Sequence, residues 1–144
     1  MAESITCLMK QEHNRILEIL NIFENHADEK VKEKQGFFNT LKWNLEKHMF
    51  VEEKAIISLY QSIVNEEVSD VFDILQEHGE INNLLNEIEK KLKRNEKPIT
   101  NELKQLLTEH VEFETSSFYP MLDEKLNEFQ KDFIINRVNE IIKE

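Results

Sequence analysis

The sequence predicts an all-α fold, an antiparallel up-down-up-down four-helix bundle with a short fifth helix at the C-terminus. Only two glycines and two prolines occur among 144 residues, which favours long helices over a turn-rich β fold. Apolar residues recur at alternating steps of three and four along four long segments, as in helices that cross at a shallow angle. Because the connections are short, consecutive helices are expected to be antiparallel neighbours.

The first predicted helix begins at Ser4, a suitable N-cap residue, and ends near Ala27. The charged stretch 28–34 connects it to a second helix over about 34–61. The side chains that these two helices are expected to turn toward the core are Ile5, Met9, His13, Ile16, Leu20, Phe23, Leu41, Leu45, His48, Glu52, Ala55 or Ile56, and Leu59.

The third predicted helix starts after Asn65, a second suitable cap, with Glu66 and Glu67 in its first turn, and ends near Arg94. The segment 95–100, which contains a proline, separates it from a fourth helix that ends near Glu124. The core-facing side chains of these two helices are expected to be Val68, Val71, Leu75, His78, Leu85, Ile88, Leu92, Ile99, Leu103, Leu106, His110, Phe113 or Glu114, Ser117 and Met121.

Pro120 lies inside the fourth helix and removes one backbone hydrogen bond, which predicts a kink just past Glu114. Asn127 and Gln130 have the spacing of a capping box and predict a fifth helix over about 127–143. Its expected apolar face is Phe129, Phe133, Ile134, Val138 and Ile141. The length suits one domain, so residues 1–144 are predicted to form a single domain with the bundle over about 4–124.

The charge balance bears on possible partners. The chain has 18 basic and 29 acidic side chains and a net charge of −11, which disfavours both nucleic acid and an anionic membrane surface. Cys7 is the single cysteine, and the first residues lack a basic and apolar leader. We therefore expect a cytoplasmic protein; the sequence indicates no particular protein partner.

Four histidines fall on four different predicted helices, each near the middle and each on the apolar face: His13, His48, His78 and His110. Two of them are followed four residues later by a glutamate, Glu52 and Glu114, and residues four apart share one helix face. In an antiparallel bundle the middles of the helices lie at one level. The six side chains are therefore expected to meet in the core.

Buried carboxylates cost several kcal/mol unless they are paired or neutralised. A pair of cations would neutralise them, and imidazole nitrogen with carboxylate oxygen suits iron, manganese or zinc. If Glu52 and Glu114 bridge two octahedral ions that also share an oxo or hydroxo group, about two coordination positions remain open. The pattern predicts a pair of such metal ions with room for a small ligand.

These residues resemble the hemerythrin-like family, also called HHE cation-binding domains, over about residues 5–126. The resemblance rests on HMFVEE from residue 48, on HVEFE from residue 110 with the following Phe118-Tyr119-Pro120, and on QEH ending at residues 13 and 78. It implies that the four histidines are terminal iron ligands and that Glu52 and Glu114 bridge. Ferritin-like bundles fit less well, because they pair glutamate with histidine as ExxH.

The chain departs from oxygen-carrying hemerythrins, which have a second histidine on helix three, four residues from the first. Here Ile74 and Asn82 flank His78 at that spacing, and His26 is expected on the surface. A fifth ligand is thus missing or is supplied by Glu53, Glu77, Glu80, Asn82 or water. This argues against reversible oxygen carriage.

Several neighbours of the cluster have two interpretations. The glutamates that precede a histidine, Glu12, Glu77 and Glu109, either orient an imidazole or face solvent. Tyr119 and Trp43 either line the pocket, where they could donate hydrogen bonds to a bound ligand, or pack in the core.

Three functions fit the pattern. The first is a non-haem di-iron protein that binds or responds to a small oxidant such as oxygen, peroxide or nitric oxide. The second is iron storage, transfer or sensing, and the third is a helical interaction module with incidental metal binding. No catalytic acid, base or nucleophile stands out beyond the cluster, so the sequence does not predict an enzyme.

Overall fold

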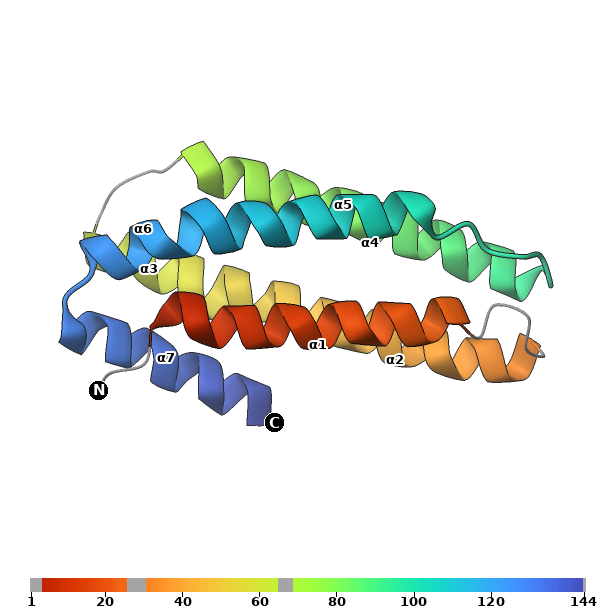
Figure 1. Ribbon diagram of the computed structural model, residues 1–144, viewed down its shortest axis with the longest axis horizontal. Helices are drawn as coiled ribbons and strands as arrows, with labels where there is room; N and C mark the ends of the chain where they lie inside the picture. The colour runs from red at the N-terminus through yellow and green to blue at the C-terminus, as the bar shows by residue number, and fades with distance from the viewer. Residues whose placement is uncertain (1–3, 26–30, 65–68, 144) are drawn as a thin grey trace.

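The computed structural model describes residues 4–25, 31–64 and 69–143, and the regular structure within those ranges is helical throughout. The elements are α1 (Ile5–Asn25), α2 (Val31–Phe50), η1 (Val51–Ile57), α3 (Ser58–Val64), α4 (Ser69–Lys93), α5 (Asn101–Phe113), η2 (Glu114–Phe118), α6 (Tyr119–Lys125) and α7 (Glu128–Lys143). The backbone keeps helical angles at the ends of η1 and η2, so α2-η1-α3 and α5-η2-α6 are each one continuous helical rod. Together with α1 and α4 they make the four rods of the bundle. The four rods and α7 confirm the predicted fold class (Figure 1).

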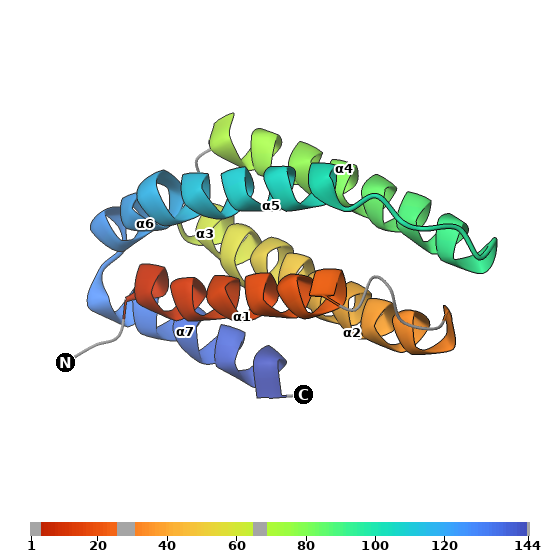
Figure 2. The ribbon, with the colours of Figure 1, turned by 45° about the vertical axis from the view of Figure 1, so that its right-hand side comes forward.

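The rods form a bundle in which α1 packs along α2 and α5, while α4 packs against α5 and α2. Figures 1 and 2 show the rods side by side, with α7 outside the bundle next to α1. This last helix also packs on η1. None of the described helices combines the length and the apolar composition that crossing a membrane requires.

Two rods contain a π turn, in which the backbone hydrogen bond spans five residues instead of four. The Ser58 N–H donates to the Glu53 carbonyl in one, and the Tyr119 N–H donates to the Glu114 carbonyl in the other. The second π turn lies directly before Pro120 and interrupts the regular ladder where the proline predicts a kink. Both π segments include a glutamate of the predicted cluster, and π turns are frequent at functional sites.

The π turn shifts the buried face of the fourth rod by one residue, and two predictions fail for that reason. Ser117 is exposed and Met121 is only half-buried, whereas Phe118 and Leu122 are wholly buried. A π turn adds one residue to the helix, so the positions after Glu114 no longer follow the spacing of the positions before it. Of the two alternatives predicted to face the core at this turn, Phe113 and Glu114, the glutamate is the buried one, with 0% of its surface exposed.

Other core predictions are wrong for local reasons. Leu75 is 41% exposed because α4 turns Ile74 inward instead, and Leu106 is half-buried because α5 buries its neighbour. Ile99 is 61% exposed, since it precedes the first turn of α5. Phe129 and Phe133 are exposed because α7 packs through one narrow face, formed by Ile134, Ile135, Val138 and Ile141.

Helix caps fix the ends of the rods. The Ser4 Oγ accepts the Cys7 N–H at 3.0 Å, and Asn127 and Gln130 exchange reciprocal hydrogen bonds at 2.8 and 3.0 Å, so both predicted caps are confirmed. A cap absent from the predictions comes from Asp123 in α6, whose carboxylate accepts the first two N–H groups of α1. The predicted Asn65 cap, Val68 and His26 lie outside the described residues.

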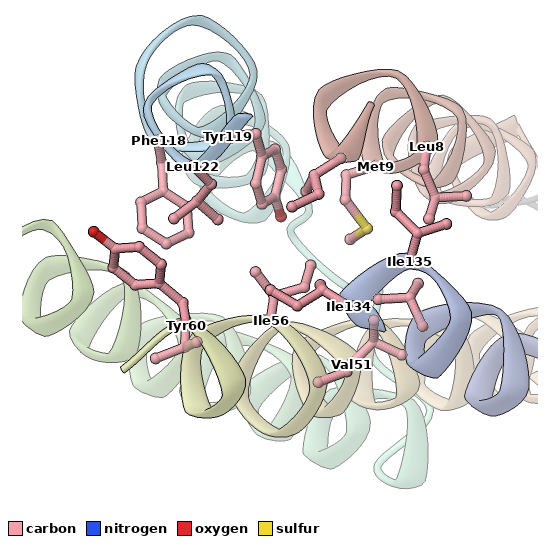
Figure 3. Packing of buried hydrophobic residues seen from close by; sticks show 14 of the residues in the cluster. Leu8, Met9, Val51, Ile56, Tyr60, Phe118, Tyr119, Leu122, Ile134 and Ile135 are labelled. Carbon is pink, nitrogen blue, oxygen red and sulfur yellow. The ribbon is translucent and has the colours of Figure 1, made fainter. Parts of the chain in front are cut away.

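The core consists of two apolar clusters separated along the bundle axis. One surrounds Met9, Ile56 and Leu122 and includes the inner face of α7 (Figure 3). The other surrounds Leu20 and Leu85 near the opposite end. On each of the four long helices the predicted histidine lies close to the boundary between the two clusters in sequence, so a polar layer occupies the middle of the bundle.

Candidate metal centre

The six predicted side chains meet in this middle layer, and each is between 0% and 4% exposed. They come from six elements: His13 (α1), His48 (α2), Glu52 (η1), His78 (α4), His110 (α5) and Glu114 (η2). Their donor atoms form two groups, each within 4.8 Å, and both groups contain the same two glutamates. One group adds His13 and His48, and the other adds His78 and His110. Two adjacent positions suitable for metal ions therefore share both carboxylates.

Glu52 directs one oxygen at three imidazoles. Its Oε1 lies 3.1 Å from the Nε2 of His48, 3.1 Å from the Nε2 of His78 and 3.5 Å from the Nε2 of His110. Helical spacing produces the first contact, because residues 48 and 52 are one turn apart. The other two contacts cross from η1 to different rods.

Glu114 has a matching arrangement. Its Oε1 lies 3.1 Å from the Nε2 of His110, one turn earlier, and 3.1 Å from the Nε2 of His13 on α1. All four imidazoles thus present Nε2 to the centre. The rings lie in edge-to-face pairs: the centroids of His13 and His48 are 4.9 Å apart with an interplanar angle of 65°, and those of His78 and His110 are 5.1 Å apart with an angle of 64°.

The outer nitrogen, Nδ1, of three imidazoles faces an oxygen of a neighbouring side chain. The Thr115 Oγ1 lies 3.3 Å from His13, the Glu77 Oε2 lies 3.0 Å from His110, and the Glu53 Oε2 lies 3.8 Å from His78. Oxygen partners on the outer nitrogen are usual for metal-binding histidines, because they fix the tautomer and the ring orientation.

The predictions for these neighbours hold only in part. Glu77 does orient an imidazole, although it is that of His110 across the bundle and not that of the adjacent His78. Glu12 pairs with Arg15 and Glu109 accepts a hydrogen bond from Gln105, so neither contacts a histidine ring. Thr115 was not predicted, and its only signal in the sequence is that it follows Glu114, inside the π turn.

The four side chains considered for a fifth ligand do not join the inner groups. Glu80 and Asn82 are exposed, whereas Glu53 and Glu77 face outer nitrogens. Ile74, one turn before His78, is fully buried and apolar, so that position supplies no ligand nitrogen.

Of the two aromatic residues, Trp43 is 63% exposed, contrary to its predicted place in the pocket or the core. Tyr119 is wholly buried, and its hydroxyl donates a hydrogen bond to the Glu52 Oε2. Burial, reinforced by the charge of Glu52, raises the pKa of the Tyr119 phenol well above its ordinary value. The hydroxyl is therefore protonated at neutral pH.

Electrostatics differ among the buried groups. Burial, with the charge of His48, lowers the pKa of His13 from 6.5 to about 3, so this imidazole is neutral at pH 7. Burial disfavours the carboxylate of Glu52, but the charge of His48 and the close approach of the His110, His48 and His78 rings outweigh it and hold that pKa well below its ordinary value. Burial also opposes a charge on His110, yet Glu52 and Glu77 raise the pKa of that imidazole.

Several inward atoms have no hydrogen-bond partner within the described part of the chain. They are the Nε2 atoms of His13, His48 and His110 and both carboxylate oxygens of Glu114. Buried polar atoms are normally satisfied, and leaving one unsatisfied costs about 1–3 kcal/mol. A metal ion supplies the missing partner for imidazole nitrogen and carboxylate oxygen alike, so the donor set fits metal binding.

A comparison with known families agrees with this geometry. The model of the hemerythrin HHE cation-binding domain matches residues 4–122. The chain belongs to this family. All six clustered side chains lie inside the matched part of the HHE domain, whereas α7 lies beyond it. No curated protein and no solved structure matched the chain.

Proposed function

We propose that this HHE domain binds a pair of iron ions bridged by Glu52, Glu114 and an oxo or hydroxo group, and that the pair binds or responds to a small oxidant. Oxygen, peroxide and nitric oxide are the oxidants considered. The observation that carries the proposal is the sharing of both glutamates by two groups of donors. A carboxylate has two oxygens and can serve two ions at once, whereas two independent sites would need separate carboxylates.

The number of donors favours an octahedral ion with open positions. Each position has two imidazoles and a share of two carboxylates, which would fill a tetrahedral zinc site completely. Iron prefers more ligands, so each ion would retain room for the bridging group and for an exogenous molecule. When bound, the iron pair supplies redox chemistry that the side chains lack.

A surface pocket supports access by a small molecule. It has a volume of about 290 Å³ and lies between α1 and α5, with His13 and Thr115 in its wall. Leu17 and Val111 make part of this wall apolar, which suits an uncharged oxidant. The pocket therefore leads from the surface to the buried imidazole of His13. It reaches the ring on the side where the Thr115 Oγ1 lies near the Nδ1 atom.

The remaining side chains keep bulk water away from the centre. The two apolar clusters close the bundle above and below the polar layer. Neutral His13 is available as a ligand without losing a proton at pH 7, because its pKa is about 3.

Anaerobic loading with ferrous iron tests the proposal. We expect two iron ions per chain and a near-ultraviolet absorption band that appears when air or peroxide is admitted. The double variant His48→Leu with Glu52→Gln is expected to bind less iron and to show no band. A wild-type protein that binds no iron, or whose spectrum in the ferrous form is unchanged by oxygen, peroxide and nitric oxide, would contradict the proposal.

Iron sensing is a second candidate, favoured by the unpartnered buried atoms. Because metal binding satisfies these atoms, loading is expected to stabilise the bundle, and stability itself can be a signal. A large stabilisation by ferrous iron combined with a spectrum that oxidants leave unchanged would favour sensing over oxidant binding.

A further inference from the structure

Tyr119 is the one wholly buried phenol that touches the carboxylate pair among the described residues. Its exposed fraction is 0%, and its hydroxyl donates to the Glu52 Oε2. It is the first residue of α6, and its own N–H closes the π turn on the Glu114 carbonyl. The same π turn therefore fixes the positions of Glu114 and of Tyr119, whose phenol contacts Glu52.

The contact gives the two oxygens of Glu52 different surroundings. Oε1 faces the Nε2 atoms of His48 and His78 at 3.1 Å, while Oε2 accepts the phenol. A carboxylate can rotate about its last torsion at little cost, so the imidazoles alone do not determine which oxygen takes which place. A fixed donor on one side removes this freedom.

In the part of the chain that the structure describes, Glu114 has no such donor. Both of its oxygens are buried without a hydrogen-bond partner in the described residues, although its Oε1 lies 3.1 Å from two imidazoles. Each of the two glutamates follows a histidine by four residues, but only Glu52 accepts a hydrogen bond from a phenol.

We propose that Tyr119 is a positioning residue of the metal centre, whose neutral hydroxyl orients Glu52 for metal binding and makes the two carboxylates inequivalent. This inference rests on the proposed function, since it concerns the same centre. Hydrogen bonds to metal-binding carboxylates typically change metal affinity by about 10–100-fold when they are removed. The hydroxyl orients the carboxylate from outside and does not itself coordinate a metal ion.

The ring of Tyr119 is held independently of its hydroxyl. It packs against Phe118 at 5.5 Å and against the His13 ring at 5.7 Å, within the apolar cluster of Figure 3. Replacing the tyrosine with phenylalanine therefore keeps the packing and removes only the hydrogen bond.

Tyr60 is a matched control. It is also 0% exposed and belongs to the same cluster, but its hydroxyl donates to the Met121 Sδ at 3.6 Å and, among the residues that the structure describes, has no hydrogen bond to a glutamate. In Figure 3 the two tyrosines extend from different rods. The pair Tyr119→Phe and Tyr60→Phe thus separates the effect on the centre from the loss of a buried hydroxyl.

The test is an anaerobic calorimetric titration of the wild type and both variants with Co²⁺, which also gives a visible spectrum. We expect Tyr119→Phe to bind Co²⁺ about 10–100-fold more weakly and to alter the spectrum of the loaded protein. Tyr60→Phe is expected to match the wild type in both. Equal affinities and spectra in all three proteins would overturn the inference, whereas a wild type that binds no Co²⁺ or Fe²⁺ would overturn the proposed function as well.

A measurement on the wild type covers the case of a Tyr119→Phe variant that does not fold. The buried hydroxyl proton of Tyr119 is expected to give a slowly exchanging proton resonance that shifts but persists when diamagnetic Zn²⁺ is added. Loss of this resonance on Zn²⁺ binding would show that the oxygen itself coordinates the metal, and the positioning role would be wrong.

Discussion

Replacing Glu114 with glutamine is expected to change the stability of the metal-free and metal-loaded proteins in opposite directions. In the metal-free protein the carboxylate is 0% exposed and both of its oxygens lack hydrogen-bond partners in the described residues. Two imidazoles lie 3.1 Å from it: His13 is neutral at pH 7, and His110 is shared with Glu52 and Glu77, so neither gives Glu114 a compensating charge of its own. A glutamine amide can instead donate to the Nε2 of His13.

The expected magnitudes follow from burial and mass action. Removing one unsatisfied buried group is worth about 1–3 kcal/mol, and a chain of this size gains about 2–4 °C in melting temperature per kcal/mol. The metal-free variant should therefore melt about 2–12 °C above the wild type. Metal at 100 times its dissociation constant stabilises by about 2.7 kcal/mol per site, so the loaded wild type should melt about 10–20 °C above its metal-free form. The loaded variant should lose most of that gain.

The assay is thermal unfolding followed by circular dichroism, with and without anaerobic Fe²⁺ or Co²⁺. The matched control is Glu112→Gln, two residues away on the exposed face, which should change neither curve. A metal-free Glu114→Gln protein that melts well below the wild type would refute the argument that this carboxylate is uncompensated. A variant stabilised by metal as strongly as the wild type would refute its role in binding.

Further predictions concern acid stability, register and capping. Unfolded His13 gains a proton near pH 6.5 but the folded residue only near 3, so the free energy of unfolding of the metal-free protein, measured in urea, should fall as the pH drops between these values. The raised pKa of His110 has the opposite pH dependence: its contribution to the free energy of unfolding should fall as the pH rises above 6.5. Leu122→Ala should cost about 2–5 kcal/mol and Ser117→Ala under about 0.5 kcal/mol, whereas equal costs would contradict the π-turn register. Asp123→Ala should cost about 0.5–2 kcal/mol by uncapping α1, and an unchanged urea midpoint would count against that cap.

The clustering of the six side chains could be predicted because it depends on helical periodicity and on the antiparallel arrangement of the helices. His48 and Glu52 are one turn apart whatever their surroundings, and so are His110 and Glu114. The level of each histidine follows from its place near the middle of a helix in an antiparallel bundle. Local rules of the same kind predicted the Ser4 cap.

The features that were missed depend on contacts between distant segments or on irregular backbone. The π turn before Pro120 moved the buried face from Ser117 to Phe118, and regular helical spacing has no means of predicting an inserted residue. The Asp123 cap joins α6 to α1 across 118 positions of sequence. The exposure of Phe129 reflects how narrowly α7 docks, which its own apolar pattern does not reveal.

The contacts around the centre were missed for the same reason. Glu77 precedes His78 in sequence, but it orients His110 on the next rod. Thr115 and Tyr119 reach the centre because a π turn redirects them. Residue types and spacing predicted which side chains cluster, while the tertiary structure decides which neighbours hold them.

An anomalous-scattering crystal structure at the iron edge, from protein loaded with iron, tests the central claim most directly. The account predicts two iron peaks per chain about 3.5–4 Å apart, one beside His13 and His48 and the other beside His78 and His110, with Glu52 and Glu114 reaching both. A single peak, or peaks that do not share the two glutamates, would contradict it.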